Sequence, residues 1–376
     1  MKKLKEKTKE KKKLSKGKKA LVIILCIICF IAVASALFIN IVTHPSKDPK
    51  NYHPVGGMVI SDTVEYKSDS AKSIRHNPIV RIMQMVWRFC EDGDNKKHAS
   101  QTPPSNTNGS ENIAYIDDGN IYHRLDMYFP EEENLDITKL PVIIDIHGGG
   151  WMYAEKDLNE YYCLELASRG YVVFNISYRL VPDVTTLEQI QDCMAALAFI
   201  KQNYQDSYSF DSVMLTGDSA GGMLAAYCAA IINSPELQKT FNTATTDLEI
   251  DSLVLTSPVA FMKDGGAFSI YTKLMWGDYG NDKVYGELMD LDKILEKSTL
   301  PPTYLITSGG DSLAHEQTHR AYDLLQKKGI ESEIADFGDD ENGKPLPHVF
   351  SILFPFDKAG QQAIDGSLEF YQKHIK

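Results

Sequence analysis

The sequence has few cysteines, and outside one apolar run none are spaced as in a metal site. Six Cys occur in 376 residues, and two of them, Cys26 and Cys29, lie within that run. The other four are far apart in the sequence: Cys90, Cys163, Cys193 and Cys228. The last three of these fall in helical patterns, where a buried free thiol is usual. We therefore expect neither a cysteine-rich metal domain nor an obligatory disulfide framework.

Beyond residue 19 the sequence also lacks any excess of positive charge. Residues 1–19 hold eleven Lys and two Glu, a net charge of +9, and the whole chain carries −12, which leaves about −21 for the remainder. Since an acidic surface repels phosphates, the main body is not expected to bind nucleic acid.

The Lys-rich arm, residues 1–19, precedes a run of about 20 residues, 20–39, that is apolar except for Ser35. At about 1.5 Å per residue, such a helix covers the roughly 30 Å of a bilayer core. We expect a single-pass transmembrane anchor over residues 20–42, with the N-terminus in the cytoplasm and residues 44–376 outside it. The alternative is secretion after signal cleavage, because small residues at 32–36 resemble a cleavage site.

Residues 43–112 are expected to contain a tether, one cap helix and a flexible loop. The tether is rich in Pro and polar residues, and residues 91–112 have almost no apolar content, which indicates the loop. Between them, apolar side chains at helical spacing mark the cap helix: Ile79, Ile82, Met83, Val86 and Trp87.

From residue 113 to 376 short apolar strands alternate with helical patterns. A hairpin is expected over 113–129, turning near 118–119. Further strands are expected at 141–147, 171–177, 212–217, 252–257 and 303–308, with helices near 158–169, 186–204, 219–233 and 314–328. This alternation predicts an α/β domain with a mostly parallel central sheet covered by helices. Residues 259–299 are expected to add a small cap or pocket wall.

Ser219 lies in "GDSAG", residues 217–221, between an apolar strand and a helix. This G-x-S-x-G pattern predicts a sharp turn that raises a nucleophilic hydroxyl above the sheet, with a helix N-terminus beneath it. The alternative is an ordinary helix cap. Upstream, "HGGGW" at 147–151 follows another strand, so the amides of Gly148, Gly149 and Ala220 are predicted to form an oxyanion hole. His147 is expected to shape this loop.

A serine nucleophile needs a base and an acid, expected in the chain order Ser, acid, His. His348 lies in a loop before the last helix, and Asp311 directly follows a strand, so we expect Asp311 to orient His348 and His348 to activate Ser219. The competing acids are Asp290, Asp292, Asp336, Asp339 and Asp340.

A second motif, "HEQTH" at 315–319, matches the H-E-x-x-H pattern of zinc hydrolases, with Glu316 as base. His315 and His319 flank the core-facing stripe of their helix on its exposed side. The following segment offers only Glu331 and Glu333 as further ligands, so no catalytic metal is expected.

Residues 110–376 resemble the hormone-sensitive-lipase-like esterase branch of the α/β-hydrolase fold. The resemblance rests on "HGGGW", "SYRL" at 177–180, "GDSAGG" at 217–222, "GGDSL" at 309–313 and "PHVF" at 347–350. It implies Ser219, Asp311 and His348 as a catalytic triad, with Gly148, Gly149 and Ala220 as oxyanion donors. Where family members often have Pro after the acid and Gly after the histidine, this chain has Ser312 and Val349.

The predicted function is hydrolysis of short-chain or acetyl carboxylic esters through an acyl-enzyme, with no cofactor. The expected partners are a small ester or an acetylated glycan, and the membrane. The alternatives are an amide, peptide or formamide hydrolase with the same triad, and a non-catalytic binding protein anchored at the cell surface.

Overall fold

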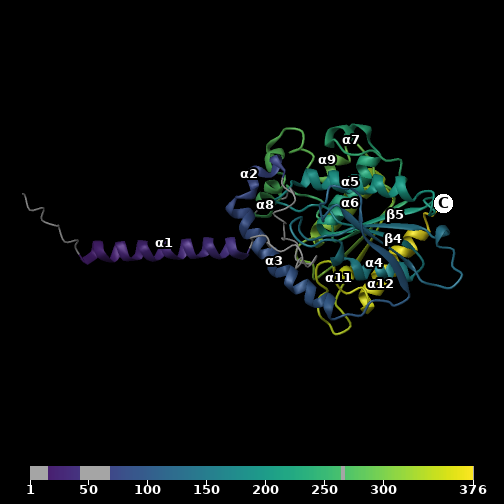
Figure 1. The fold of residues 1–376 in the computed structure, drawn as a ribbon, viewed down its shortest axis with the longest axis horizontal. Coiled ribbons are helices and arrows are strands. Elements are labelled where there is room, and N and C mark those ends of the chain that lie inside the picture. Colours follow the sequence, from purple (N-terminus) through teal and green to yellow (C-terminus); the bar gives the residue numbers. More distant parts are fainter. Residues whose placement is uncertain (1–15, 43–67, 264–266, 376) are drawn as a thin grey trace, which may run out of the picture. The chain divides into compact units, whose positions relative to one another are not determined.

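The computed structural model describes residues 16–42, 68–263 and 267–375. The chain divides into two compact units, Met1–His44 and Pro45–Lys376. The first unit contains helix α1 (Lys16–Val42), drawn in purple in Figure 1. In the ranges that the structure describes, no helix has both the length and the apolar content needed to cross a membrane. The predicted span over residues 20–42 thus finds no support there, and most of the Lys-rich arm and of the tether lies outside the described residues.

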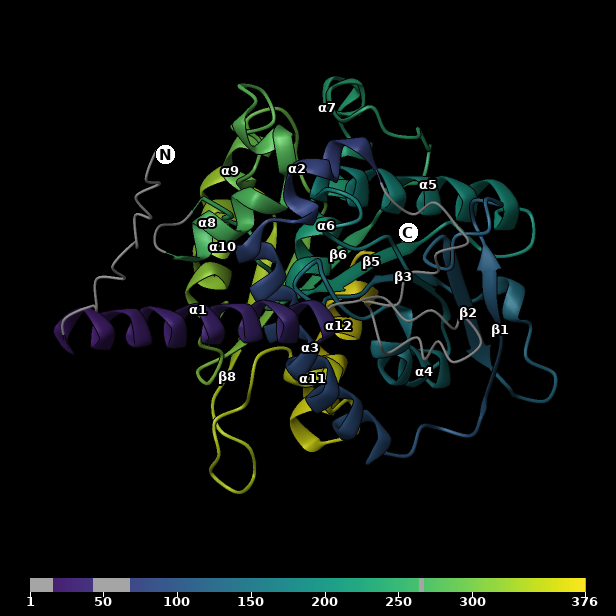
Figure 2. The same cartoon turned by 60° about the vertical axis from the view of Figure 1, so that its left-hand side comes forward.

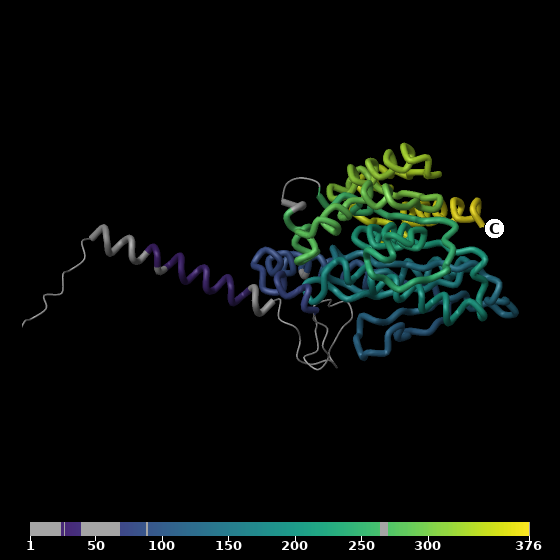
Figure 3. The backbone as a smooth tube through the Cα atoms, turned by 90° about the horizontal axis from the view of Figure 1, so that it is seen from above, coloured from purple at the N-terminus to yellow at the C-terminus, as the bar shows by residue number. Residues whose placement is uncertain are grey.

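The second unit is built on one eight-stranded sheet with the order β1-β2-β4-β3-β5-β6-β7-β8. The pairs β1·β2 and β2·β4 are antiparallel, and all other pairs are parallel. Figure 3 shows this order as a change of colour from blue at one edge to green and yellow at the other. The strands are β1 (Thr107–Ala114), β2 (Arg124–Pro130), β3 (Val142–Ile146), β4 (Val172–Ile176), β5 (Val213–Asp218), β6 (Ser252–Thr256), β7 (Thr303–Ser308) and β8 (Ser332–Phe337).

Helices cover both faces of the sheet, which explains the near-continuous apolar strands. In β3, Ile144 packs into one core cluster and Ile143 into the other, because successive side chains point to opposite faces. Figures 1 and 2 place α5 (Thr186–Tyr204) and α6 (Ser219–Ile232) on one side of the strands. The opposite face carries α4 (Glu160–Ser168), α11 (Phe350–Leu353) and α12 (Lys358–Gln372). The predicted mostly parallel α/β sheet is therefore confirmed.

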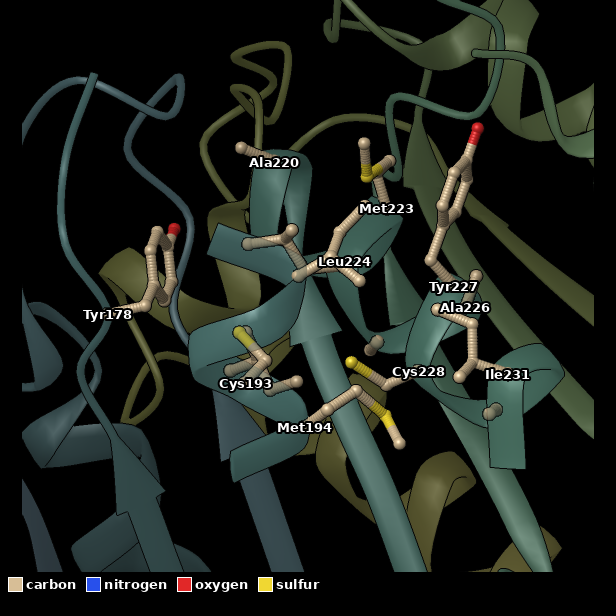
Figure 4. Close-up of a cluster of buried hydrophobic side chains, with 14 of the residues drawn as sticks. Tyr178, Cys193, Met194, Ala220, Met223, Leu224, Ala226, Tyr227, Cys228 and Ile231 are labelled. Carbon is tan, nitrogen blue, oxygen red and sulfur yellow. The ribbon is translucent and has the colours of Figure 1, made fainter. Parts of the chain in front are cut away.

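The helix α6 is buried along its whole length, so its side chains form the centre of one core. Figure 4 shows Met194 of α5 next to Cys228 of α6 in this cluster. Cys193 and Cys228 are buried and free, as is Cys163 on the other face. Among the described cysteines none forms a disulfide.

The cap helix α3 (Pro78–Ala99) is longer than the sequence indicated. The predicted loop over 91–112 is helical as far as Ala99, and β1 begins at Thr107. The cause is polar burial, because Asp94 accepts hydrogen bonds from the Tyr153 hydroxyl (3.0 Å) and the Lys97 ammonium (2.8 Å). Polar contacts of this kind leave no apolar period in the sequence. Only part of the predicted apolar stripe of this helix is buried. Met83 and Trp87 pack on the core, whereas three of its side chains remain exposed: Ile79, Ile82 and Val86.

Residues 259–299 lie beside the cap helix, since the Tyr271 hydroxyl of this segment accepts a hydrogen bond from Trp87 of α3. They contain α8 (Ala267–Met275), a short 3-10 helix (Gly277–Asn281) and α9 (Leu291–Ile294). Trp276 is fully buried, and its indole nitrogen lies 3.3 Å from the Met262 sulfur. The remaining described helices are α2 (Lys72–Arg75), α7 (Pro235–Phe241) and α10 (His315–Lys328).

Candidate active site

Ser219 lies in a sharp turn between β5 and α6. Its backbone has φ = 50°, a left-handed conformation that costs a non-glycine residue of order 1–3 kcal/mol and often marks a functional site. A Cβ added to Gly221 would come within 2.0 Å of the Ile146 carbonyl oxygen, and one on Gly217 within 2.5 Å of the Gly221 carbonyl oxygen. The flanking glycines are therefore required, because any side chain there would push the turn away from β3.

The structure brings Ser219, His348 and Asp311 together, although they come from distant parts of the sequence. Nε2 of His348 lies 2.9 Å from the Ser219 hydroxyl, and its Nδ1 lies 2.9 Å from both carboxylate oxygens of Asp311. Asp311 follows β7, and His348 lies in the loop between β8 and α11. Because β5 and β7 run parallel, their carboxyl ends meet at one edge of the sheet, and this edge carries the site.

Asp311 is held as an ionised acceptor. Its carboxylate is inaccessible to solvent and accepts the amides of Leu313 (3.0 Å) and Ala314 (2.9 Å). Burial by itself would raise the pKa of Asp311, but the hydrogen bond and charge of His348 and the Ala314 amide outweigh burial and lower that pKa. A carboxylate at this position keeps one imidazole nitrogen protonated and leaves the other free to accept the serine proton.

The glycine loop after β3 lies beside the serine, with one difference from the prediction. Gly149 (φ = 101°) and Gly150 (φ = 55°) adopt conformations that favour glycine. Gly148, however, donates its amide to Oδ1 of Asp218 (2.9 Å), so it is not a free oxyanion donor as predicted. Within the described part of the chain, the amides of Gly149 and Ala220 make no such hydrogen bond and remain available to a ligand.

Asp218 takes the Gly148 amide because its buried carboxylate needs donors. Asn159 donates one hydrogen bond to Oδ1 of Asp218 (2.9 Å) and one to Asp145 (2.8 Å), which joins two buried carboxyl groups. Burial raises the pKa of Asp218 to about 6, although Asn159, the charge of His348 and the Gly148 amide act in the opposite direction. Burial and the nearby Asp218 hold the pKa of Asp145 well above its usual range. The sequence reasoning missed Asp218, which directly precedes the serine.

Aromatic residues from the cap also hold the glycine loop. The Tyr271 hydroxyl donates to the Gly150 carbonyl (2.7 Å) and accepts from the indole nitrogen of Trp87 (2.8 Å). His147 stacks on Tyr178 with ring centroids 4.3 Å apart, and burial lowers the pKa of His147 to about 3. His147 is therefore neutral and structural, which agrees with the predicted loop-shaping role.

Two cavities meet at Ser219 and His348. The larger has a volume of about 290 Å³ and is lined mainly by apolar side chains of the cap. The smaller has about 30 Å³ and extends along Gly149 and Gly150 toward Tyr153 and Asp94. The nucleophile thus faces one apolar pocket and one narrow recess that Asp94 and Asp218 line together with apolar side chains.

The H-E-x-x-H motif lies on α10, outside these cavities. Glu316 is exposed, and both imidazoles contact Asp336 of β8. The two Glu considered as further ligands pair elsewhere: Glu331 with His374 and Glu333 with Lys373. The competing acid Asp336 is thereby placed away from the serine.

Comparison with known proteins gives a consistent result. The BD-FAE family model matches residues 125–264. Lipase 2 of Moraxella sp. (strain TA144) is 24% identical over 58% of this chain and 58% of its own length. Isoprenylcysteine alpha-carbonyl methylesterase of Arabidopsis thaliana is 27% identical over 56% of this chain and 52% of its own length. The chain thus spans just over half the length of these curated relatives.

A solved structure matches over more of the chain. Esterase B from Lactobacillus rhamnosis, inhibited by a C4-C4 tributyrin phosphonate, has a TM-score of 0.74 and 26% identity, and the match covers 80% of this chain and 96% of that one. The chain therefore has the α/β-hydrolase fold, and its sequence motifs resemble those of the hormone-sensitive-lipase-like branch.

Proposed function

We propose that this chain hydrolyses carboxylic esters through an acyl-enzyme formed on Ser219. The observation that carries the proposal is the continuous chain of hydrogen bonds from Asp311 through His348 to the Ser219 hydroxyl. This arrangement lets an imidazole remove the serine proton while a carboxylate stabilises the imidazolium that forms. Ester hydrolysis also agrees with the names of the relatives.

The reaction follows from the positions of these groups. Oγ of Ser219 attacks the ester carbonyl carbon as its proton passes to Nε2 of His348. The negative carbonyl oxygen accepts hydrogen bonds from the amides of Gly149 and Ala220. When the tetrahedral intermediate collapses, the C–O bond to the alcohol breaks and the alcohol takes the proton from His348. Water then attacks the acyl-enzyme by the same route and releases the acid.

We propose that the substrates carry short acyl chains. The cavity beside Ser219 has a volume of about 290 Å³, which lies at the lower end of the range of roughly 300–1,000 Å³ for small-molecule pockets. Its apolar wall favours hydrocarbon over charge. Tributyrin and p-nitrophenyl butyrate are therefore the first substrates to test, followed by acetylated glycan.

The test compares wild-type protein with Ser219→Ala. We expect the variant to lose at least about 1,000-fold in turnover of p-nitrophenyl butyrate, because no nucleophile remains. A fluorophosphonate probe should label the wild type and not the variant, and circular dichroism should show that both are folded. Near-normal turnover by Ser219→Ala, or no labelling of the wild type, would refute the proposal.

We also propose that residues 20–42 attach the catalytic domain to a membrane, with the domain outside the cytoplasm. Support comes from the apolar run in the sequence and from the exposure of its large side chains, which are 52–74% exposed between Ile24 and Phe38. In cells, the full chain should stay in the membrane fraction after a carbonate wash, and a chain beginning at residue 45 should not. Release of the full chain by carbonate would contradict the proposal.

A further inference from the structure

Two imidazoles and one carboxylate converge on the side of α10 away from the serine. His315 and His319 are one helical turn apart, so their side chains lie on the same face of α10. The Nε2 atoms of both lie close to one carboxylate oxygen of Asp336, at 2.9 Å and 2.8 Å. All three side chains are partly open to solvent, with exposed fractions of 36%, 42% and 37%.

The strand register places Asp336 under the helix. β8 pairs in parallel with β7, and Asp336 lies opposite Thr307 near the carboxyl end of the sheet. α10 packs against both strands, so its first turn lies above this end. The convergence therefore depends on backbone elements that the sheet holds in place, rather than on a surface loop.

These donors suit a divalent transition-metal ion. Zinc binds imidazole nitrogen and carboxylate oxygen at about 2.0–2.2 Å, and a tetrahedral site keeps its ligand atoms about 3.3–3.5 Å apart. The three ligand atoms already lie within 4.8 Å of one another. A half-exposed carboxylate has to retreat by only about 0.5 Å to admit the ion. The formal net charge of −12 favours the approach of a cation.

We propose that His315, His319 and Asp336 form a binding site for one zinc-class divalent cation. Solvent supplies the fourth ligand, because the three side chains are open on their outer side. The site is a binding site rather than a second hydrolytic centre, since Glu316, the base expected of an H-E-x-x-H enzyme, is exposed and is not among the converging groups.

The bound ion connects the two segments that lead to the triad residues Asp311 and His348. The amide of His315 donates to the Asp311 carbonyl (3.2 Å), so the first turn of α10 adjoins the catalytic acid. At the end of β8, the Phe337 carbonyl accepts the amide of Gly309 (2.8 Å), and the loop that follows leads to His348. A cation held between α10 and β8 therefore stabilises this corner of the domain.

The experiment measures binding of ZnCl₂ alone to the full chain after treatment with chelator. Equilibrium dialysis with metal analysis should give one zinc ion per wild-type chain. His319→Ala and Asp336→Asn should each weaken this binding at least tenfold. Glu316→Gln is the matched control, because it changes the remaining fixed residue of the motif and should bind zinc like the wild type.

Two further measurements complete the test. Co²⁺ should give the intense visible absorption of a tetrahedral site in wild type and Glu316→Gln, and not in the other two variants. Zinc should raise the melting temperature of the same two proteins only, with circular dichroism confirming that every variant is folded. Binding below one equivalent in the wild type, or equal affinity in all four proteins, would overturn the proposal whatever the esterase activity.

Discussion

Replacing Asp218 with Asn should change how the stability of the protein depends on pH. The pKa of this buried carboxyl is raised from 3.8 to about 6, so the folded protein holds its proton more tightly than the unfolded chain does. Protonated Asp218 therefore makes its full contribution to the folding stability below about pH 3.8, and this contribution is lost as the pH rises to about 6. Above that pH the wild type carries a penalty of about 3 kcal/mol, since one pKa unit corresponds to about 1.4 kcal/mol.

Asn mimics the protonated carboxyl group and does not titrate. Its amide oxygen can still accept hydrogen bonds from Gly148 and Asn159, which both reach Oδ1 of Asp218. Its NH₂ group replaces Oδ2, a buried atom without a hydrogen-bond partner, and costs about 1–3 kcal/mol at every pH. The stability difference between wild type and Asp218→Asn therefore includes both the unpaired NH₂ group and the titration of Asp218. Only the titration makes this difference change with pH.

The assay is urea unfolding of wild type and Asp218→Asn at pH 5, 6 and 7. From these pKa values, ionisation of Asp218 should lower the free energy of unfolding of the wild type by about 1.6 kcal/mol at pH 5 and by about 2.9 kcal/mol at pH 7. Between these two pH values, the stability of the variant should therefore rise by about 1 kcal/mol relative to that of the wild type. Asp206→Asn, at an exposed position, is the control and should show no such gain. A difference between Asp218→Asn and wild type that stays constant from pH 5 to 7 would refute the reasoning.

Three other substitutions test the site. Asp311→Asn keeps the shape of the acid but not its charge, so kcat for p-nitrophenyl butyrate should fall about 10⁴-fold with little change in KM; a loss below tenfold would contradict its role. Gly150→Ala places a Cβ 2.6 Å from Cε2 of Trp87, on a backbone with φ = 55°, and should lower the free energy of unfolding by about 1–3 kcal/mol. Gly93→Ala is the control and should not destabilise the protein, because no atom lies near the added Cβ. Tyr271→Phe leaves the Trp87 indole and the Gly150 carbonyl without the Tyr271 hydroxyl and should cost about 2 kcal/mol in urea unfolding. Unchanged stability would show that these two hydrogen bonds do not stabilise the glycine loop.

Local patterns in the sequence were sufficient to predict the central parallel strands and the order of the chemical groups. A parallel sheet brings the carboxyl ends of its strands to one edge, so groups that directly follow strands can be expected to meet there. Ser219 and Asp311 both follow apolar strands, and the glycines around Ser219 indicate a turn with no room for side chains. These features depend on a few neighbouring residues, and a single sequence therefore reveals them.

Polar contacts between distant segments were decided only by the tertiary structure. The Gly148 amide is bound by Asp218 instead of being free, and α3 continues to Ala99 because Asp94 is buried among polar partners. Likewise, Asp336 meets two histidines because the β7–β8 register aligns it with α10. Apolar periodicity reports which face of an element is buried, but a hydrogen bond between segments leaves no period in the sequence, so these contacts appear only when the chain is folded.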